Sequence, residues 1–329
     1  MPRLPSARLA GLACALALAL AGAAGADPAF WKNEFPRTDF TISAVSDWGE
    51  ILDGGPGRDG IPALENPAFI PVAEESRLDP REPVMVLAID GAPARAYPLR
   101  YLIWHEIAND VVAGIPVAVT FCPLCNSALV FDRRVGGAVL TFGVTGKLRA
   151  SDMVMYDRES ESWWQQAVGL GIVGRYTGTQ LEQLPSWTEA WADFRAHHPD
   201  GLVMDEPDFP RMYGANPYTG YDRRERPYPF YTGEDPPGGV PALARVVRVG
   251  NRAWPLSRLA KGGEIHEAGV VISWAGEQAS ALDTRRIAAG RSVASVRVRD
   301  ATGNDLPHDV MFAFAFHALV PDGIWMTGE

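Results

Sequence analysis

The chain has 329 residues, of which 47% are hydrophobic and 21% charged, with 30 basic against 40 acidic residues. The net charge of −10 argues against nucleic acid or an anionic membrane as a partner, because both repel an acidic surface. The length is sufficient for one large or two modest domains.

The first residues have the pattern of an export signal. A short basic region precedes the apolar stretch Leu9–Ala21, which is short for a membrane helix. Ala24-Gly25-Ala26 then forms a small-residue cleavage site. We therefore expect residues 1–26 to be a signal peptide, and the mature protein, periplasmic or secreted, to begin at Asp27.

Cleavage would change both the charge and the cysteine count. Arg3 and Arg8 are removed, so 28 basic against 40 acidic residues remain and the net charge falls from −10 to −12. Cys14 is removed as well, and Gly11-Leu12-Ala13 before it is a poor match to a lipoprotein signal. No later segment is apolar and long enough for a membrane helix, so we expect no integral membrane segment after cleavage.

Composition divides the mature chain into four regions. Residues 27–81 are rich in glycine and proline, which predicts an extended arm that wraps the body. Strand patterns in residues 82–205 and 242–329 predict two β-rich units. Residues 206–241 between them are rich in proline, glycine and tyrosine, which indicates a linker or a long loop packed by its tyrosines. The predicted fold class is mainly β with a few helices (α+β).

A strand pair and a helix open the first unit. Val84–Ile89 and Ala94–Tyr97 are strand-like and flank a tight Asp90-Gly91 turn. Pro98 suits the first turn of a helix, and Leu99–Asn109 has helical spacing.

Later segments give further predictions. Val139–Val144 and Met153–Tyr156 are strand-like. Ser186–Glu189 has the form of a capping box, which predicts a helix through about His197. Met311–Val320 is interpreted as another strand.

A faint internal repeat relates the two predicted units. Val86–Leu99 and Val246–Leu256 each end in an aromatic-proline-leucine corner after a predicted strand pair. Ser127-Ala128-Leu129 is echoed by Ser280-Ala281-Leu282, but the second copy has no cysteines. If the chain contains a duplication, the chemistry stayed in the first copy and the second became scaffold. The matches are short enough to arise by chance.

The only cysteines of the predicted mature chain, Cys122 and Cys125, lie in the sequence Thr-Phe-Cys-Pro-Leu-Cys-Asn-Ser. The β-branched run Ile115–Phe121 precedes the pair and the apolar run Ala128–Phe131 follows it, so a strand, a tight turn and a strand are predicted. Such a turn points two sulfurs the same way, close to backbone N–H groups. We expect any chemistry of this chain to begin there.

A close cysteine pair in an exported protein allows several interpretations. A disulfide is the default outside the cytoplasm, although so short a loop gains little stability from one. A thioredoxin-like pair needs its first cysteine at a helix N-terminus, and here a strand follows. Asn126 in place of histidine excludes the usual haem attachment, and a four-ligand zinc site lacks its second turn. A metal held by both thiolates and one or two other groups also stays open.

His105 is the best third ligand for such a metal, because it lies near the end of the predicted helix that leads into the cysteine strand. The alternative is a histidine that is satisfied at the helix C-terminus. Glu106 and Asp110 could accept hydrogen bonds from the imidazole and orient it.

Met153 and Met155 alternate on one side of a predicted strand, with Asp152 on the other side. Methionine pairs usually fill a core, but a thioether beside thiolates and imidazole is a ligand set that soft copper prefers. Either methionine is therefore a candidate fourth ligand. Asp152 could take part in a turn salt bridge, or line a pocket as an outer contact of the site.

Five phrases together resemble a known bacterial family, that of the domain of unknown function 3179. They are Tyr97–Leu99, Trp104–Asp110, Thr120–Cys125, Ser151–Arg158 and Ser162–Gln166. The resemblance runs from about Pro80 to the C-terminus and implies no established activity, so it locates the residues of interest without assigning their chemistry. Ala150 departs from the polar residue expected before Ser151-Asp152, which would loosen a local hydrogen bond.

The leading functional hypothesis is an exported metal-binding protein, copper before zinc, that carries the metal or uses it in redox chemistry. A thiol–disulfide oxidoreductase without metal is the second hypothesis, and a non-catalytic binding module with a structural disulfide is the third. The expected partner is another exported protein or a small molecule. The sequence identifies no catalytic residue and does not decide whether the chain is an enzyme.

Overall fold

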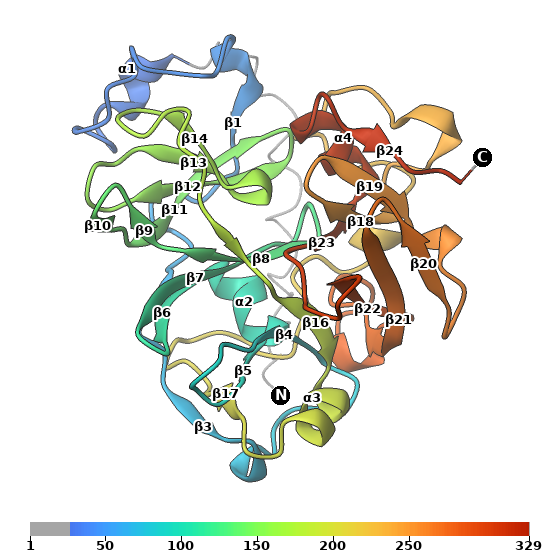
Figure 1. Cartoon of the computed structure of the whole chain (residues 1–329). Helices are drawn as coiled ribbons and strands as arrows, with labels where there is room; N and C mark the ends of the chain where they lie inside the picture. Colours follow the sequence, from blue (N-terminus) through green and yellow to red (C-terminus); the bar gives the residue numbers. More distant parts are fainter. Residues whose placement is uncertain (1–26, 329) are drawn as a thin grey trace, which may run out of the picture.

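The computed structural model describes residues 27–328, and the predicted signal peptide lies outside them. The described chain is mainly β with four α-helices, which confirms the predicted class. Its five larger sheets are arranged as a five-bladed β-propeller (Figure 1). None of the helices between residues 27 and 328 has the length and apolar character needed to cross a membrane.

The first three sheets each have five strands. The first contains β1 (Ile51–Asp53), β11 (Phe142–Arg149), β12 (Asp152–Asp157), β13 (Trp163–Gln165) and β14 (Leu170–Val173). The second contains β15 (Gln183–Leu184), β8 (Ser127–Asp132), β7 (Ile115–Cys122), β6 (Ile107–Val112) and β2 (Leu64–Glu65). The third contains β16 (Trp187–Ala190), β4 (Pro83–Leu87), β5 (Arg95–Pro98), β17 (Leu202–Met204) and β3 (Phe69–Pro71).

The remaining sheets lie in the C-terminal part, apart from one small ribbon. The fourth contains β23 (Asp309–Phe312), β18 (Arg245–Val249), β19 (Arg252–Pro255) and β24 (Ile324–Trp325). The fifth contains β20 (Glu264–Glu267), β21 (Val270–Ala279) and β22 (Ser292–Asp300), and the ribbon pairs β9 (Arg134–Val135) with β10 (Ala138–Val139). The α-helices are α1 (Pro28–Trp31), α2 (Leu99–His105), α3 (Trp191–His197) and α4 (Ala313–Leu319).

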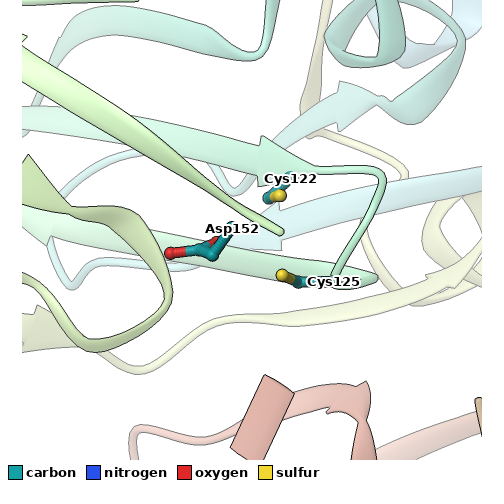
Figure 2. A group of neighbouring side chains, drawn as sticks. All are labelled: Cys122, Cys125 and Asp152. Carbon is teal, nitrogen blue, oxygen red and sulfur yellow. The ribbon is translucent and has the colours of Figure 1, made fainter. Parts of the chain in front are cut away.

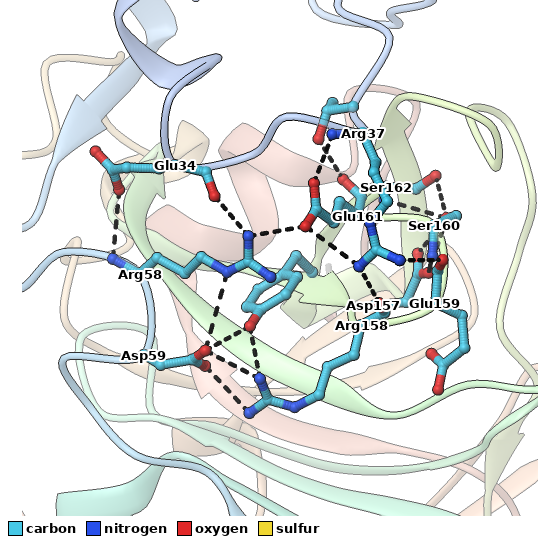
Figure 3. A network of polar contacts seen from close by, with 12 residues as sticks. Glu34, Arg37, Arg58, Asp59, Asp157, Arg158, Glu159, Ser160, Glu161 and Ser162 are labelled. Atoms are coloured by element: carbon cyan, nitrogen blue, oxygen red, sulfur yellow. Dashed lines mark hydrogen bonds and ion pairs between the residues drawn. The ribbon is translucent and has the colours of Figure 1, made fainter.

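The stretch from residue 27 to residue 81 adds one edge strand to each of the first three sheets, namely β1, β2 and β3. Its early part is fastened to the strand β12 and to the loop that follows β12 by polar and charged side chains (Figure 3). Glu161, only 3% exposed, accepts a hydrogen bond of 2.9 Å from Arg58. Asp59 accepts hydrogen bonds from the Tyr156 hydroxyl at 2.5 Å and from Arg158 at 2.9 Å. The arm is therefore an integral part of the folded body.

The third and fourth sheets share one topology, although they come from opposite ends of the chain. Each has a central antiparallel hairpin, β4–β5 or β18–β19, flanked by an antiparallel strand on one side and a parallel strand on the other. A helix joins the two flanking strands in both cases, α3 in one and α4 in the other. The corners Tyr97-Pro98 and Trp254-Pro255 end the equivalent strands β5 and β19. The sequence echo thus falls at matching places in the fold.

The chain nevertheless does not divide into two separate units at residues 206–241. The largest group of buried apolar side chains extends from Leu64 to Leu319 and includes Tyr221 and Tyr231 from this stretch. The Tyr221 hydroxyl also donates a hydrogen bond of 3.0 Å to the Leu124 carbonyl. Residues 206–241 are therefore a long packed loop, and the description as two units is not supported.

Three element predictions were wrong in part, each for a tertiary reason. The helix predicted over Leu99–Asn109 ends at His105, because the next residues pair with β7 as the strand β6. Ser186–Glu189 does not cap a helix, since Trp187–Ala190 pair with β4 and the helix begins at Trp191. Beyond Phe312 the predicted strand 311–320 is the helix α4, whose buried sides leave no polar face to reveal its period.

Candidate functional site

The strands β7 and β8 form a hairpin around the two cysteines, which confirms the predicted strand, turn and strand. Cys122 ends β7 and pairs with Ser127, the first residue of β8. In the loop between them, the Asn126 N–H donates a hydrogen bond of 3.2 Å to the Pro123 carbonyl, and Asn126 adopts a left-handed φ of 51°. Asparagine tolerates that conformation better than most residues. The tight loop turns both sulfurs toward one region (Figure 2).

The strand β23 holds this loop from its other side. The Asn126 side-chain amide donates to the Val310 carbonyl at 2.6 Å, and the Phe312 N–H donates to the Cys125 carbonyl at 2.8 Å. The Ser127 hydroxyl donates to the Asp309 carboxylate at 2.6 Å. The C-terminal part of the chain therefore fixes the position of the cysteine hairpin.

A second hairpin, β11–β12, brings a carboxylate to the sulfurs. Arg149 pairs with Asp152, and the two residues between them, Ala150 and Ser151, have φ values of 50° and 63°. Two successive left-handed residues form the type I′ turn of a tight hairpin, a conformation that costs free energy for residues other than glycine or asparagine. Ala150, where the family resemblance led us to expect a polar residue, is the first of these two.

Cys122, Cys125 and Asp152 form a compact buried cluster. One ligand atom of each, the two Sγ atoms and a carboxylate oxygen, lies within 4.8 Å of the others. Figure 2 shows the three side chains as close neighbours, and their exposed fractions are 1%, 0% and 0%. Asp152 accepts hydrogen bonds at Oδ2 from the Gln165 amide (2.6 Å) and the Ala167 N–H (3.0 Å). Its buried Oδ1 has no hydrogen-bond partner among residues 27–328.

The surroundings of the cluster disfavour charge on its three members. Burial raises the pKa of Cys122 and, further, that of Cys125, and it also raises the pKa of Asp152. The Met153 N–H donates to the Cys122 sulfur at 3.4 Å, and the Cys125 thiol donates to the Ser151 carbonyl at 3.6 Å. Without a cation the cysteines are neutral thiols, so a bound metal would supply the charge that deprotonates them.

His105 lies in another environment. One ring nitrogen, Nδ1, is 2.7 Å from the Pro62 carbonyl, and Nε2 is 2.6 Å from the Tyr213 hydroxyl. The ring packs edge-on against Phe209, with 4.8 Å between ring centroids. Both nitrogens are occupied, and His105 is outside the cluster of possible ligands. The hydrogen bond to Pro62 connects α2 to the N-terminal arm.

We expect His105→Ala to lower the free energy of unfolding by about 2 kcal/mol, because the change removes two hydrogen bonds and ring packing from a buried position. The metal content should stay unchanged. Urea denaturation together with metal analysis of the purified variant measures both quantities. Loss of the metal with unchanged stability would instead return His105 to the ligand set.

The other predicted residues are distributed around the cluster. Met153 and Met155 are buried side chains of the main core, on the opposite face of β12 from Val154. Asp110 was predicted to accept a hydrogen bond from the His105 imidazole. It accepts hydrogen bonds from the Tyr97 hydroxyl (2.6 Å) and from Arg95 instead. Glu106 follows α2 with a left-handed φ of 59°, and its buried carboxyl group borders a cavity described below.

Asp152 was predicted to be an outer contact of the site, whereas its carboxylate lies in the cluster itself. The long-range contacts that hold Asp152 were missed, although Gln165 stands in one of the five resemblance phrases. Arg248, which donates to the Ala167 carbonyl at 2.5 Å, and Asp309 had no sequence signal at all. Both come from the second copy of the repeated sheet, so only the fold connects them to the cysteines.

Replacing Glu106 by glutamine should stabilise the protein more at alkaline than at acidic pH. Burial, aided by the charge of Asp152, raises the pKa of the Glu106 carboxyl from 4.5 to about 8. Between these values the unfolded state has released the proton that the folded state retains, so the wild type loses stability as the pH rises. The loss is on the order of 4 kcal/mol. Urea unfolding of both proteins at pH 5 and pH 9 measures it; a variant-to-wild-type difference independent of pH would contradict the buried carboxyl.

The fold and the cluster define a β-rich protein with a buried site of two thiols and one carboxylate. The model of one protein family, described as "Protein of unknown function (DUF3179)", matches residues 58–323, and the chain belongs to this family. The family prediction made from the five phrases is thereby confirmed. The searches of curated proteins and of solved structures each gave no match.

Proposed function

We propose that this protein binds one metal ion between Cys122, Cys125 and Asp152. The observation that carries the proposal is the convergence of three buried ligand atoms within 4.8 Å of one another. Two hairpins with left-handed turn residues are needed to bring them together. Non-glycine residues held in left-handed conformations are found most often at functional sites.

The ligand set favours zinc over the copper expected from the sequence. Copper was predicted on the basis of two thiolates, an imidazole and a thioether, which are soft or borderline donors. In the structure the third donor beside the sulfurs is a carboxylate oxygen, and His105 is occupied elsewhere. Zinc accepts thiolate and carboxylate ligands together. Three protein ligands also leave one position of a tetrahedral site open, as in zinc sites that bind a further molecule.

A thiol–disulfide enzyme is the weaker candidate. Both cysteines are free and buried, and burial raises the pKa values of both thiols. Exchange chemistry needs an accessible cysteine with a lowered pKa. Neither cysteine starts a helix, because the strand β8 follows them directly.

Metal reconstitution of the mature protein tests the proposal. After anaerobic purification we expect about one equivalent of zinc per chain, measured by mass spectrometry, because the three donors suit a single ion. Asp152→Asn should weaken zinc binding at least tenfold, whereas copper(I) bound by the two sulfurs should be little affected. Asp157→Asn is the matched control, since Asp157 is a buried aspartate of the same strand held by Trp164 and Ser160. A protein that takes up neither metal would refute the site.

A further inference from the structure

A cavity lies beside the cysteine hairpin and is lined in part by residues next to the proposed metal ligands. It has a volume of about 150 Å³ and is lined by Leu124 of the cysteine loop, Met153 next to Asp152, and Glu106. The packed loop closes it with Tyr218, Tyr228 and Phe230. An apolar cavity of roughly this volume holds a molecule the size of benzene, about six non-hydrogen atoms.

The N-terminal arm supplies the outer wall of this cavity. Gly54, Pro56 and Ile61 line it, and the arm is fixed there by backbone hydrogen bonds from Gly54 to the Gly146 carbonyl (2.8 Å) and from Asp59 to the Val144 carbonyl (2.9 Å). The cavity is therefore assembled from three regions distant in sequence.

Glu106 is the unusual residue of the lining. Its exposed fraction is 7%, and within residues 27–328 its carboxyl group has no hydrogen-bond or salt-bridge partner. The nearby carboxylate of Asp152 has the same sign of charge and so raises the pKa of Glu106 further. The cationic side chain of the lining, Lys147, is paired with Asp53 (3.2 Å) and Glu34 (3.7 Å). A buried carboxyl group without a cationic partner costs free energy unless a ligand supplies one.

A second polar group borders the same space. Tyr218 is partly buried, and burial together with the charge of Glu106 raises its pKa, so the phenol stays neutral and its oxygen can accept a hydrogen bond. The Tyr228 ring packs against Tyr221, with 4.5 Å between ring centroids, and the Arg224 guanidinium lies 4.9 Å from the Tyr228 ring centroid. The remaining lining, with Ile61, Val144 and Phe230, is apolar.

We propose that this cavity binds a small primary ammonium ion with a short apolar chain. Near neutral pH the cation would displace the proton that buried Glu106 retains in its absence. The N–H groups of the ligand would then donate to the resulting carboxylate and to the Tyr218 hydroxyl oxygen, and the carbon chain would contact the apolar wall. A divalent metal in the cysteine cluster would not repel this cation. The two thiolates and the carboxylate carry one more negative charge than the metal carries positive charge, so the occupied cluster is anionic. The proposal rests on the cavity and Glu106, and it is independent of the metal site.

Isothermal titration calorimetry of the full chain with n-butylammonium, 1-butanol and butyrate tests this assignment. We expect saturable binding of butylammonium at least tenfold tighter than of 1-butanol, and no binding of butyrate. Glu106→Gln should remove the preference for the cation, and Glu74→Gln, which changes an exposed glutamate, should leave it intact. Tyr218→Phe keeps the shape of the cavity and should weaken butylammonium binding severalfold.

Equal binding of butylammonium and 1-butanol, or no binding of either, would overturn the assignment, and so would a cation preference that survives Glu106→Gln in a cooperatively folded variant. The same titration of the Cys122→Ser, Cys125→Ser double variant separates the two proposals. Butylammonium binding there supports the cavity whether or not the wild type takes up metal.

Discussion

Changing Cys122 and Cys125 together to serine is expected to reduce the metal content from about one equivalent to less than a tenth, because the remaining carboxylate cannot hold a zinc ion by itself. The substitution is nearly isosteric at two buried positions, so the fold should survive it with a cooperative unfolding transition. Mass spectrometry of the native protein gives the stoichiometry, and circular dichroism gives the transition.

Zinc should also stabilise the wild type and not the double variant. A metal that binds only the folded state at 100 times its dissociation constant adds about 2.7 kcal/mol to the free energy of unfolding. Thermal denaturation with and without added zinc measures this difference. If zinc stabilised both proteins equally, the metal would be bound elsewhere.

Gly146→Ala is expected to have the largest effect on stability, roughly 3 to 5 kcal/mol. Gly146 has a φ of 75°, and a methyl group there would lie 1.8 Å from the Pro56 carbonyl oxygen of the arm. Backbone of the arm or of the hairpin must shift to relieve that contact. Urea denaturation measures the loss, and limited proteolysis after Arg58 detects an arm that has come away.

Gly137→Ala provides the matched control for this prediction. Gly137 also has a positive φ, 84°, but a methyl group there would meet no atom within 4 Å. Its replacement should cost only about 1 kcal/mol, the price of the backbone conformation. Similar losses of unfolding free energy for the two variants would contradict the close contact between the arm and Gly146.

Local features of the fold could be predicted from the sequence. The hairpin around Cys122 and Cys125 is marked by two apolar runs on either side of a short turn, and the structure confirms it. The aromatic-proline-leucine corners led to the repeat, and they occupy equivalent positions in two sheets of the same topology. These signals are carried by neighbours in the chain, which is why they are visible without a structure.

Contacts between distant segments could not be predicted. Asp152 reaches the sulfurs because Ala150 and Ser151 both adopt left-handed conformations. Alanine and serine rarely adopt this conformation, so the sequence does not predict the turn. Glu189 looked like part of a capping box, but pairing of its strand with β4 overrides that local preference. His105 was chosen for its place in the sequence, yet its partners Pro62 and Tyr213 come from the arm and the long loop. Each of these outcomes depends on tertiary packing.

A diffraction experiment at the zinc absorption edge tests the central claim most directly. On crystals of the zinc-reconstituted protein we expect one anomalous peak, about 2.3 Å from each sulfur of Cys122 and Cys125 and about 2.0 to 2.2 Å from an oxygen of Asp152. No peak between these three side chains, or a peak bound by His105 with Asp152 turned away, would contradict the proposed site.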